Sequence, residues 1–188
     1  MPSITLNQKV VEKIIGTKLS IEKLKDRISM LGTDLDSISN NEIKVEIFPN
    51  RPDLLCEHGF GRALASFVGS VKGLRSYKVS KSGYKVIVDP SVTMRPYTAC
   101  AVVRGLKITG EQLSEIIQLQ DKLAMTHGRN RKKSAYGIYP LDSLEFPIKY
   151  IAFDPATVEF QPLGFQHRIK ASEIIELHPK GRAYAHLT

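Results

Sequence analysis

Four cations fall within one short segment of the chain, Arg129-Asn130-Arg131-Lys132-Lys133, directly after Gly128. An arginine guanidinium presents a planar fork of donors that fits a phosphate, and a lysine ammonium acts as a mobile point charge. Four cations at a helix end can therefore hold a nucleic-acid backbone, largely without reading its sequence. A solvated helix end explains a charge run of this kind equally well.

Two glutamines, Gln118 and Gln120, precede this basic run on a predicted helix. Gln120 lies about two turns before the helix end, so its amide can project toward the same place as the cations. Ordinary solvent exposure accounts for both glutamines without any ligand. From the residues alone, exposure is the simpler interpretation.

A second segment with chemical potential is Phe48-Pro49-Asn50-Arg51-Pro52-Asp53-Leu54-Leu55. Its two prolines fix φ on either side of Asn50 and Arg51 and hold a rigid turn, and Asp53 is predicted to cap the following helix. Arg51 either pairs with a nearby carboxylate or contacts a ligand. We expect the structural role.

Signatures of common enzymes and metal sites are missing from the sequence. It contains no GxxxxGK[ST], GxGxxG or GxSxG segment. The five histidines are scattered without HExxH pairing, and the two cysteines lack CxxC spacing. We therefore predict no metal site, reduced cysteines and no self-contained enzyme of a common type. No window is long and apolar enough for a membrane span, so we expect no membrane association.

The first eighty residues predict a small α+β module. The pattern indicates a strand at residues 4–6, helices over 8–15 and 21–31, a strand over 43–47, and a helix that follows Asp53 and buries Leu55, Phe60, Leu64, Phe67 and Val68. Asn7 and Ser20 are placed as N-caps, and Gly16 and Gly32 as helix stops.

The rest of the chain predicts short strands around one long helix. Strands are expected at 84–88, 98–103, 135–138 and 148–153, and a short helix over 172–177 that ends at Pro179. Thr109 and Gln112 form a capping box for the long helix, whose buried stripe is predicted to be Leu113, Ile116, Ile117, Leu123 and Ala124. The mixed order indicates an α+β class, with one domain over 1–80 and another over 84–188.

The composition is that of a folded globular protein. The chain has 188 residues, of which 42% are hydrophobic and 24% charged, and a formal net charge of +8. That mixture is too apolar for a disordered chain. The surplus of positive charge favours an anionic partner, which can be a nucleic acid, an acidic protein or a membrane surface.

Six short stretches, in order along the whole chain, resemble the N-terminal part of the phenylalanyl-tRNA synthetase β subunit of the archaeal and eukaryotic type. They are Phe48-Pro49-Asn50-Arg51-Pro52-Asp53-Leu54-Leu55, Lys78-Val79-Ser80-Lys81-Ser82-Gly83, Arg95-Pro96-Tyr97, Ile117-Gln118-Leu119-Gln120, Gly128-Arg129-Asn130-Arg131-Lys132-Lys133 and His178-Pro179-Lys180-Gly181-Arg182-Ala183-Tyr184-Ala185-His186-Leu187. Each stretch alone is weak, but six in register are specific.

The resemblance implies an α2β2 ligase that joins phenylalanine to tRNA(Phe) with ATP and Mg²⁺ in the cytoplasm. The α subunit holds the aminoacylation centre, so this chain is not expected to charge tRNA alone or to bind a cofactor. Residues 1–80 resemble the N-terminal module of the β subunit. Residues 84–188 resemble the first part of the domain that hydrolyses tyrosine wrongly attached to tRNA(Phe), with most hydrolytic residues beyond Thr188.

The resemblance also assigns candidate site residues. Gln120, Arg129 and Arg131 are implied to lie beside the editing cleft, where they position tRNA or substrate and do not transfer protons. Lys132 and Lys133 are implied to contact backbone phosphate. No catalytic residue is assigned.

One position departs from the family pattern. Many relatives carry a His-Asp or Phe-Asp pair where this chain has Tyr139-Pro140, which changes the polar character of any pocket there. Two hypotheses of other classes are a stand-alone RNA-binding or deacylating module and a purely structural assembly domain. The chain stops inside a family stretch, which favours a truncated β subunit over both.

Overall fold

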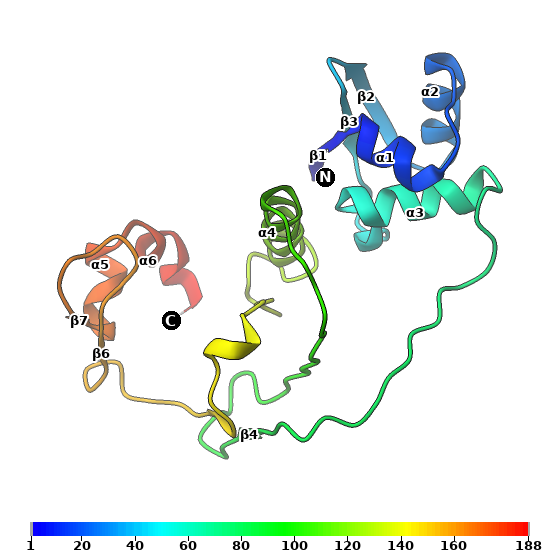
Figure 1. Ribbon diagram of the computed structural model, residues 1–188. Helices are drawn as coiled ribbons and strands as arrows, with labels where there is room; N and C mark the ends of the chain where they lie inside the picture. Colours follow the sequence, from blue (N-terminus) through cyan, green and yellow to red (C-terminus); the bar gives the residue numbers. More distant parts are fainter. Residues whose placement is uncertain (1, 188) are drawn as a thin grey trace. The chain divides into compact units, whose positions relative to one another are not determined.

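The computed structural model describes residues 2–187 (Figure 1). Contacts between its residues group the chain into two compact units. One unit is Met1–Lys78 with Leu106–Gly137, and the other is Val79–Gly105 with Ile138–Thr188. The sequence places its boundary between residues 80 and 84, whereas these contacts group residues 106–137 with the N-terminal module. The α+β class expected from the sequence is confirmed.

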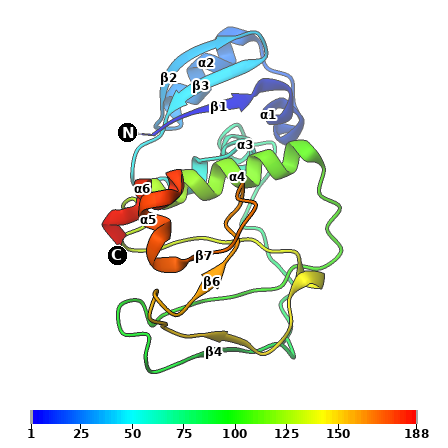
Figure 2. The same cartoon turned by 90° about the vertical axis from the view of Figure 1, so that its left-hand side faces the viewer.

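The first unit contains a three-stranded antiparallel sheet (Figure 2). Its strands are β1 (Ser3–Asn7), β2 (Asp34–Ser39) and β3 (Glu42–Glu46), in the order β1-β3-β2. The sequence did not predict β2, since the segment contains two aspartates and aspartate is depleted in strands. A two-residue turn at Asn40 and Asn41, with φ of 50° and 65°, closes the β2–β3 hairpin, and asparagine is one of the residues that favour such turns.

Two helices of this unit begin and end where their capping residues predict. Helix α1 (Gln8–Ile15) starts at Asn7, whose side chain accepts the Val10 N–H, and ends at Gly16 with φ of 72°. Helix α2 (Ile21–Met30) starts at Ser20, whose hydroxyl oxygen accepts the Lys23 N–H. These predictions are confirmed because each depends on only three or four adjacent residues.

The third helix starts later than predicted. A 3₁₀ turn, η1 (Pro52–Leu54), precedes α3 (Glu57–Phe67), and Cys56 is the N-cap. The prediction that Asp53 caps this helix is wrong. Its carboxylate instead accepts two hydrogen bonds from the Arg51 guanidinium, at 3.0 and 2.9 Å, which confirms the structural role expected for Arg51.

The hydrophobic core of the chain lies in this first unit. Its buried members come from the sheet, the η1 turn, the residues directly after them, and helices α1, α2 and α3: Ile4, Leu6, Val11, Ile15, Leu24, Ile28, Ile43, Val45, Ile47, Leu54, Leu55, Phe60 and Leu64. Phe67 was predicted to be buried but is 41% exposed, because it ends α3. A Cβ at Gly61 would lie 3.0 Å from the Ile14 side chain, so α1 and α3 pack closely there.

Helix α4 (Gly110–Met125) is the longest helix and belongs to the first unit. Its capping box of Thr109 and Gln112 is confirmed. The predicted buried stripe is partly wrong, because Leu113 and Ile117 are each 51% exposed. Ala124 is buried as predicted. The side chains that pack against the core are Leu119 and Leu123.

The second unit is built from short elements. They are β4 (Val86–Val88) parallel to β5 (Ile148–Tyr150), β6 (Glu159–Phe160) antiparallel to β7 (Ile169–Lys170), η2 (Leu141–Ser143), η3 (Ala171–Glu173), α5 (Ile174–Leu177), α6 (Pro179–Tyr184) and η4 (Ala185–Leu187). The strands predicted over 98–103 and 135–138 are wrong, because the backbone there has no ladder partner in the part of the chain that the structure describes. Pro179 ends α5 and also begins α6.

Apolar side chains of the second unit are mostly exposed. Pro162 and Ile169 are the two buried residues among its described residues. Tyr97, Met94 and Leu163 are each at least 90% exposed. Burial of apolar area is the main favourable term in folding, so this unit has little core of its own.

Candidate nucleic-acid interface

The basic run folds back onto the end of α4. The backbone N–H groups of Arg129, Asn130 and Arg131 donate to the carbonyls of Thr126, Met125 and Ala124, at 3.0, 3.1 and 3.0 Å. Carbonyls in the last turn of a helix have no partner within the helix, and these bonds satisfy them. The loop also places cations at the negative end of the helix dipole, where positive charge is favoured.

The backbone of this loop is strained. Arg129, Asn130 and Arg131 have φ of 49°, 54° and 66°, a conformation that costs a residue with a Cβ roughly 1–2 kcal/mol. Gly128 makes the loop possible, because a Cβ there would lie 2.5 Å from the carbonyl oxygen of Ala124. Strained backbone of this kind is concentrated at functional sites.

Three of the four cations extend into solvent. Arg129, Lys132 and Lys133 are exposed and form no ion pair within residues 2–187. Arg131 is half-buried, and its Nη2 lies 3.2 Å from Oδ1 of Asp121 on α4. An exposed pair of this kind contributes about 0–1 kcal/mol, so a phosphate can compete for the guanidinium.

Gln120 is placed on the same helix, one residue before Asp121, and is half-buried. Its Nε2 donates to the carbonyl of Tyr136 at 2.5 Å, which ties α4 to the segment that follows the basic loop. The structure therefore brings Gln120 and the loop to the C-terminal half of α4.

A carboxylate on α4, which the sequence did not indicate, attaches this helix to the N-terminal module. Oε1 of Glu115 accepts the backbone N–H of His58 at 2.9 Å, and Oε2 lies 2.6 Å from Nδ1 of the same histidine. Because a carboxylate can only accept, this second contact requires the proton on Nδ1. The Glu115 side chain is 14% exposed. A carboxylate is favoured here, since His58 lies in the first turn of α3.

Two further features support this attachment of α4. Nζ of Lys122 donates to the carbonyl of Ser3 on β1 at 2.8 Å, and Leu119 and Leu123 pack against the hydrophobic core. Burial raises the pKa of the Cys56 thiol at the start of α3, and the charge of Glu115 adds to that rise. No sequence signal links residues 57 positions apart, so sequence reasoning could not find this contact.

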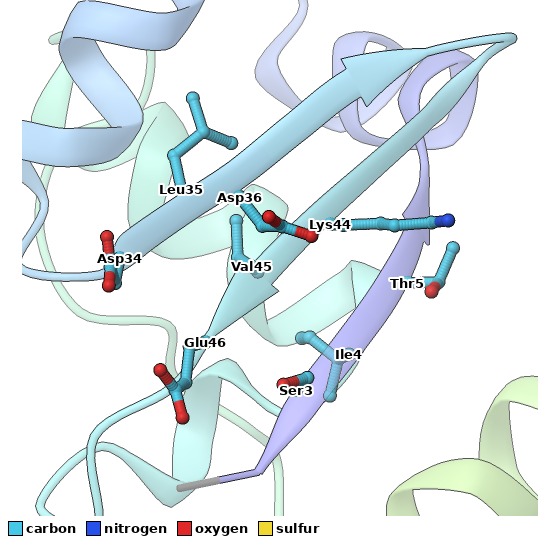
Figure 3. Close-up of a pocket in the computed structure, with 9 residues that line it drawn as sticks. All are labelled: Ser3, Ile4, Thr5, Asp34, Leu35, Asp36, Lys44, Val45 and Glu46. Carbon is cyan, nitrogen blue, oxygen red and sulfur yellow. The ribbon is translucent and has the colours of Figure 1, made fainter.

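A hollow of about 490 Å³ lies on the sheet of the first unit (Figure 3). Its lining residues come from all three strands: Ser3, Ile4, Thr5, Asp34, Leu35, Asp36, Lys44, Val45 and Glu46. It contains three carboxylates and one ammonium, so it does not suit a phosphate, and none of the predicted site residues lies there.

Across residues 2–187 the structure contains no group of three or more His, Cys, Asp or Glu side chains that could bind a metal ion. None of the helices in that range is both long enough and apolar enough to cross a membrane.

Comparisons with known proteins cover the whole chain. Residues 1–70 match the family model of the Phe-tRNA synthetase beta subunit B1 domain. A phenylalanine–tRNA ligase beta subunit from Archaeoglobus fulgidus is 40% identical over 98% of this chain and 34% of its own length. The same subunit from Methanosarcina acetivorans is 36% identical over 100% of this chain and 34% of its own length.

The fold agrees with a solved structure. An N-terminal fragment of the phenylalanyl-tRNA synthetase beta subunit from Pyrococcus horikoshii superposes with a TM-score of 0.89 at 37% identity. The match covers 99% of this chain and 55% of that fragment. This chain spans about a third of the length of the curated relatives it matches.

Proposed function

The chain is a relative of the phenylalanine–tRNA ligase β subunit over its whole length, and we propose that it acts as the N-terminal part of such a subunit. The observation that carries this proposal is the combination of 36–40% identity over 98–100% of the chain with the fold match to the Pyrococcus horikoshii fragment. The complete enzyme would attach phenylalanine to tRNA(Phe) with ATP and Mg²⁺ in the cytoplasm, as an α2β2 assembly with the synthetase α subunit.

In our proposal, neither ATP nor Mg²⁺ binds to this chain. The sequence has no glycine-rich phosphate loop, and residues 2–187 contain no group of three metal-binding side chains. Both cofactors would therefore bind elsewhere in the complete enzyme. This chain would contribute contacts to tRNA and part of a proofreading site.

Proofreading is needed because phenylalanine and tyrosine differ by one hydroxyl. An apolar pocket rejects an added hydroxyl only about a hundredfold. A second site that recognises this hydroxyl and hydrolyses the ester supplies the missing discrimination. In our proposal, residues 1–80 form the N-terminal module and residues 84–188 the first part of that editing domain.

Within this site, Gln120, Arg129 and Arg131 would position tRNA or substrate, and Lys132 and Lys133 would contact backbone phosphate. The hydrogen-bonded loop supports this role, because its fixed backbone orients the cations before any ligand binds. Arginine suits phosphate through its fork of donors.

A chimeric enzyme tests the proposal. This chain replaces the matching third of the Archaeoglobus fulgidus β subunit, which is co-expressed with the α subunit of that organism. We expect an assembled enzyme that charges tRNA(Phe) and releases tyrosine from Tyr-tRNA(Phe). Arg131→Ala should raise the ratio of tyrosyl-tRNA to phenylalanyl-tRNA about tenfold, the effect of losing one interaction of about 1.4 kcal/mol.

Lys13→Ala on α1 is the matched control, since Lys13 is an exposed cation in the same unit. A chimera that folds but does not assemble with the α subunit would contradict the proposed function. Equal tyrosyl-tRNA ratios for Arg131→Ala and Lys13→Ala would remove Arg131 from the editing site. The chain alone should give no ATP–pyrophosphate exchange.

A further inference from the structure

A second concentration of positive charge lies between α3 and β4, outside the site described above. Lys72, Arg75, Lys78 and Lys81 recur at every third residue, and we call residues 72–81 the basic strap. No aspartate or glutamate occurs between Glu57 and Asp89. The strap therefore carries four positive charges without any acidic residue nearby in sequence.

The structure leaves this strap open to solvent. Every residue from 69 to 85 is exposed, and residues 71–85 form neither helix nor strand (Figure 1). None of its four cations forms an ion pair with another described residue. One side chain of the strap is held in place, since the Tyr77 hydroxyl accepts a hydrogen bond from Arg62 on α3 at 3.5 Å.

The spacing of the cations arranges them as a line. An extended chain rises about 3.1–3.4 Å per residue, so cations three residues apart lie roughly 9–10 Å from one another. A period of three also matches the turn of a polyproline-type segment, and in such a segment these side chains would lie on one side. Mutual repulsion of the charges keeps such a segment extended.

A line of unpaired cations fits the phosphate backbone of RNA. Nucleic acids present phosphates at regular intervals along a strand, and lysine and arginine contact them without reading sequence. Tyr77 is 70% exposed and offers a face on which an unpaired base can stack. A membrane surface is less well matched, because the strap has no helix with an apolar face.

We propose that the basic strap binds the phosphate backbone of RNA. This site goes beyond the proposed function, because none of its residues belongs to the candidate editing site. Each phosphate contact contributes about 0.7–0.9 to the slope of log Kobs against log salt concentration. Four contacts therefore contribute about 3.

The test compares two fourfold variants of this chain. The strap variant carries Lys72→Gln, Arg75→Gln, Lys78→Gln and Lys81→Gln. The control variant carries Lys9→Gln, Lys13→Gln, Lys23→Gln and Lys25→Gln, which remove the same charge from exposed positions on α1 and α2. Binding to fluorescein-labelled tRNA is measured by anisotropy between 50 and 200 mM KCl, with circular dichroism to confirm that each variant is folded.

The strap variant should lower the salt slope by about 3, and the control variant by less than about 1. Equal slopes for the two variants would overturn the proposal, because net charge alone would then explain binding. Vesicles containing phosphatidylserine and a poly-glutamate peptide are tested in parallel. Stronger strap-dependent binding to either of them than to tRNA would also overturn it.

Failure of this proposal can be distinguished from failure of the proposed function. A double variant, Arg129→Ala with Arg131→Ala, removes the loop cations and leaves the strap intact. The proposal requires that the strap variant still lowers the slope in this background. The tyrosyl-tRNA ratio of the chimeric enzyme reports on the editing site alone.

Discussion

The attachment of α4 to the N-terminal module makes a measurable prediction for Glu115→Ala. The carboxylate accepts the His58 N–H at 2.9 Å and lies 2.6 Å from its ring nitrogen. A hydrogen bond to a charged group contributes about 1.5–3 kcal/mol. The His58 side chain is 59% exposed, so water replaces its lost partner and the ring contact contributes less than about 1 kcal/mol.

We therefore expect Glu115→Ala to lower the free energy of unfolding of the first unit by about 2 kcal/mol. Glu115→Gln should cost about half as much, because the amide oxygen still accepts the His58 N–H but lacks the charge. The measurement is urea denaturation followed by circular dichroism. Hydrogen exchange resolved to peptides of α4 gives a local readout, and amides in residues 113–124 should exchange faster.

The control is Glu111→Ala, which removes an exposed carboxylate from the first turn of the same helix. Its cost should be about 0.3–1 kcal/mol, the range of a charge interacting with the helix dipole. A double-mutant cycle of His58→Ala with Glu115→Ala should give a coupling energy of at least about 0.5 kcal/mol. The reasoning fails if the coupling is zero and hydrogen exchange in α4 is unchanged.

Three further predictions concern the start of α3. Iodoacetamide should alkylate the exposed Cys100 in the native protein and spare Cys56, because the Cys56 thiol is buried and has a raised pKa. In 6 M guanidinium at about pH 8, both cysteines should be alkylated. Peptide mass spectrometry measures the alkylation of each cysteine. Gly59→Ala should unfold the first unit or lower its free energy of unfolding by more than about 4 kcal/mol, because the added Cβ would overlap the carbonyl of Asp53. Urea denaturation measures this change, and a loss below about 1 kcal/mol would contradict the prediction. The hydrogen bonds from Arg51 hold the pKa of Asp53 below its usual 3.8, so the pair stabilises the protein above about pH 4 and this contribution is lost as the pH falls through the lowered pKa. Asp53→Asn should therefore reduce the difference in stability between pH 7 and pH 3, by less than about 1 kcal/mol because the pair is half exposed, and an unchanged difference would refute it.

Sequence reasoning succeeded where a few adjacent residues determine the geometry. The N-cap at Asn7, the N-cap at Ser20 and the capping box at Thr109 were all predicted, because a cap involves residues within one turn. It failed at Asp53, where the carboxylate had two possible partners nearby. A hydrogen bond to Arg51 prevailed over capping, and the sequence alone does not rank the two.

The candidate site was likewise predicted from the sequence only in part. The position of the basic run at a helix end was predicted from Gly128 and the charges that follow it. The left-handed backbone of the loop was not, because it depends on how Gly128 fits between the carbonyls of Ala124 and Ser134. The strand at 98–103 was predicted from apolar character alone, yet a strand also requires a hydrogen-bonding neighbour.

Helix α4 connects the N-terminal module to the basic loop at residues 129–133. One face of the helix binds the module through Glu115 and Leu119, and the end of the same helix carries the loop. Residues 106–137 therefore belong to the same compact unit as residues 1–78. If the loop positions RNA, the N-terminal module is the base that holds it, and truncating the chain after residue 80 would remove Leu119 and expose the core side chains against which it packs.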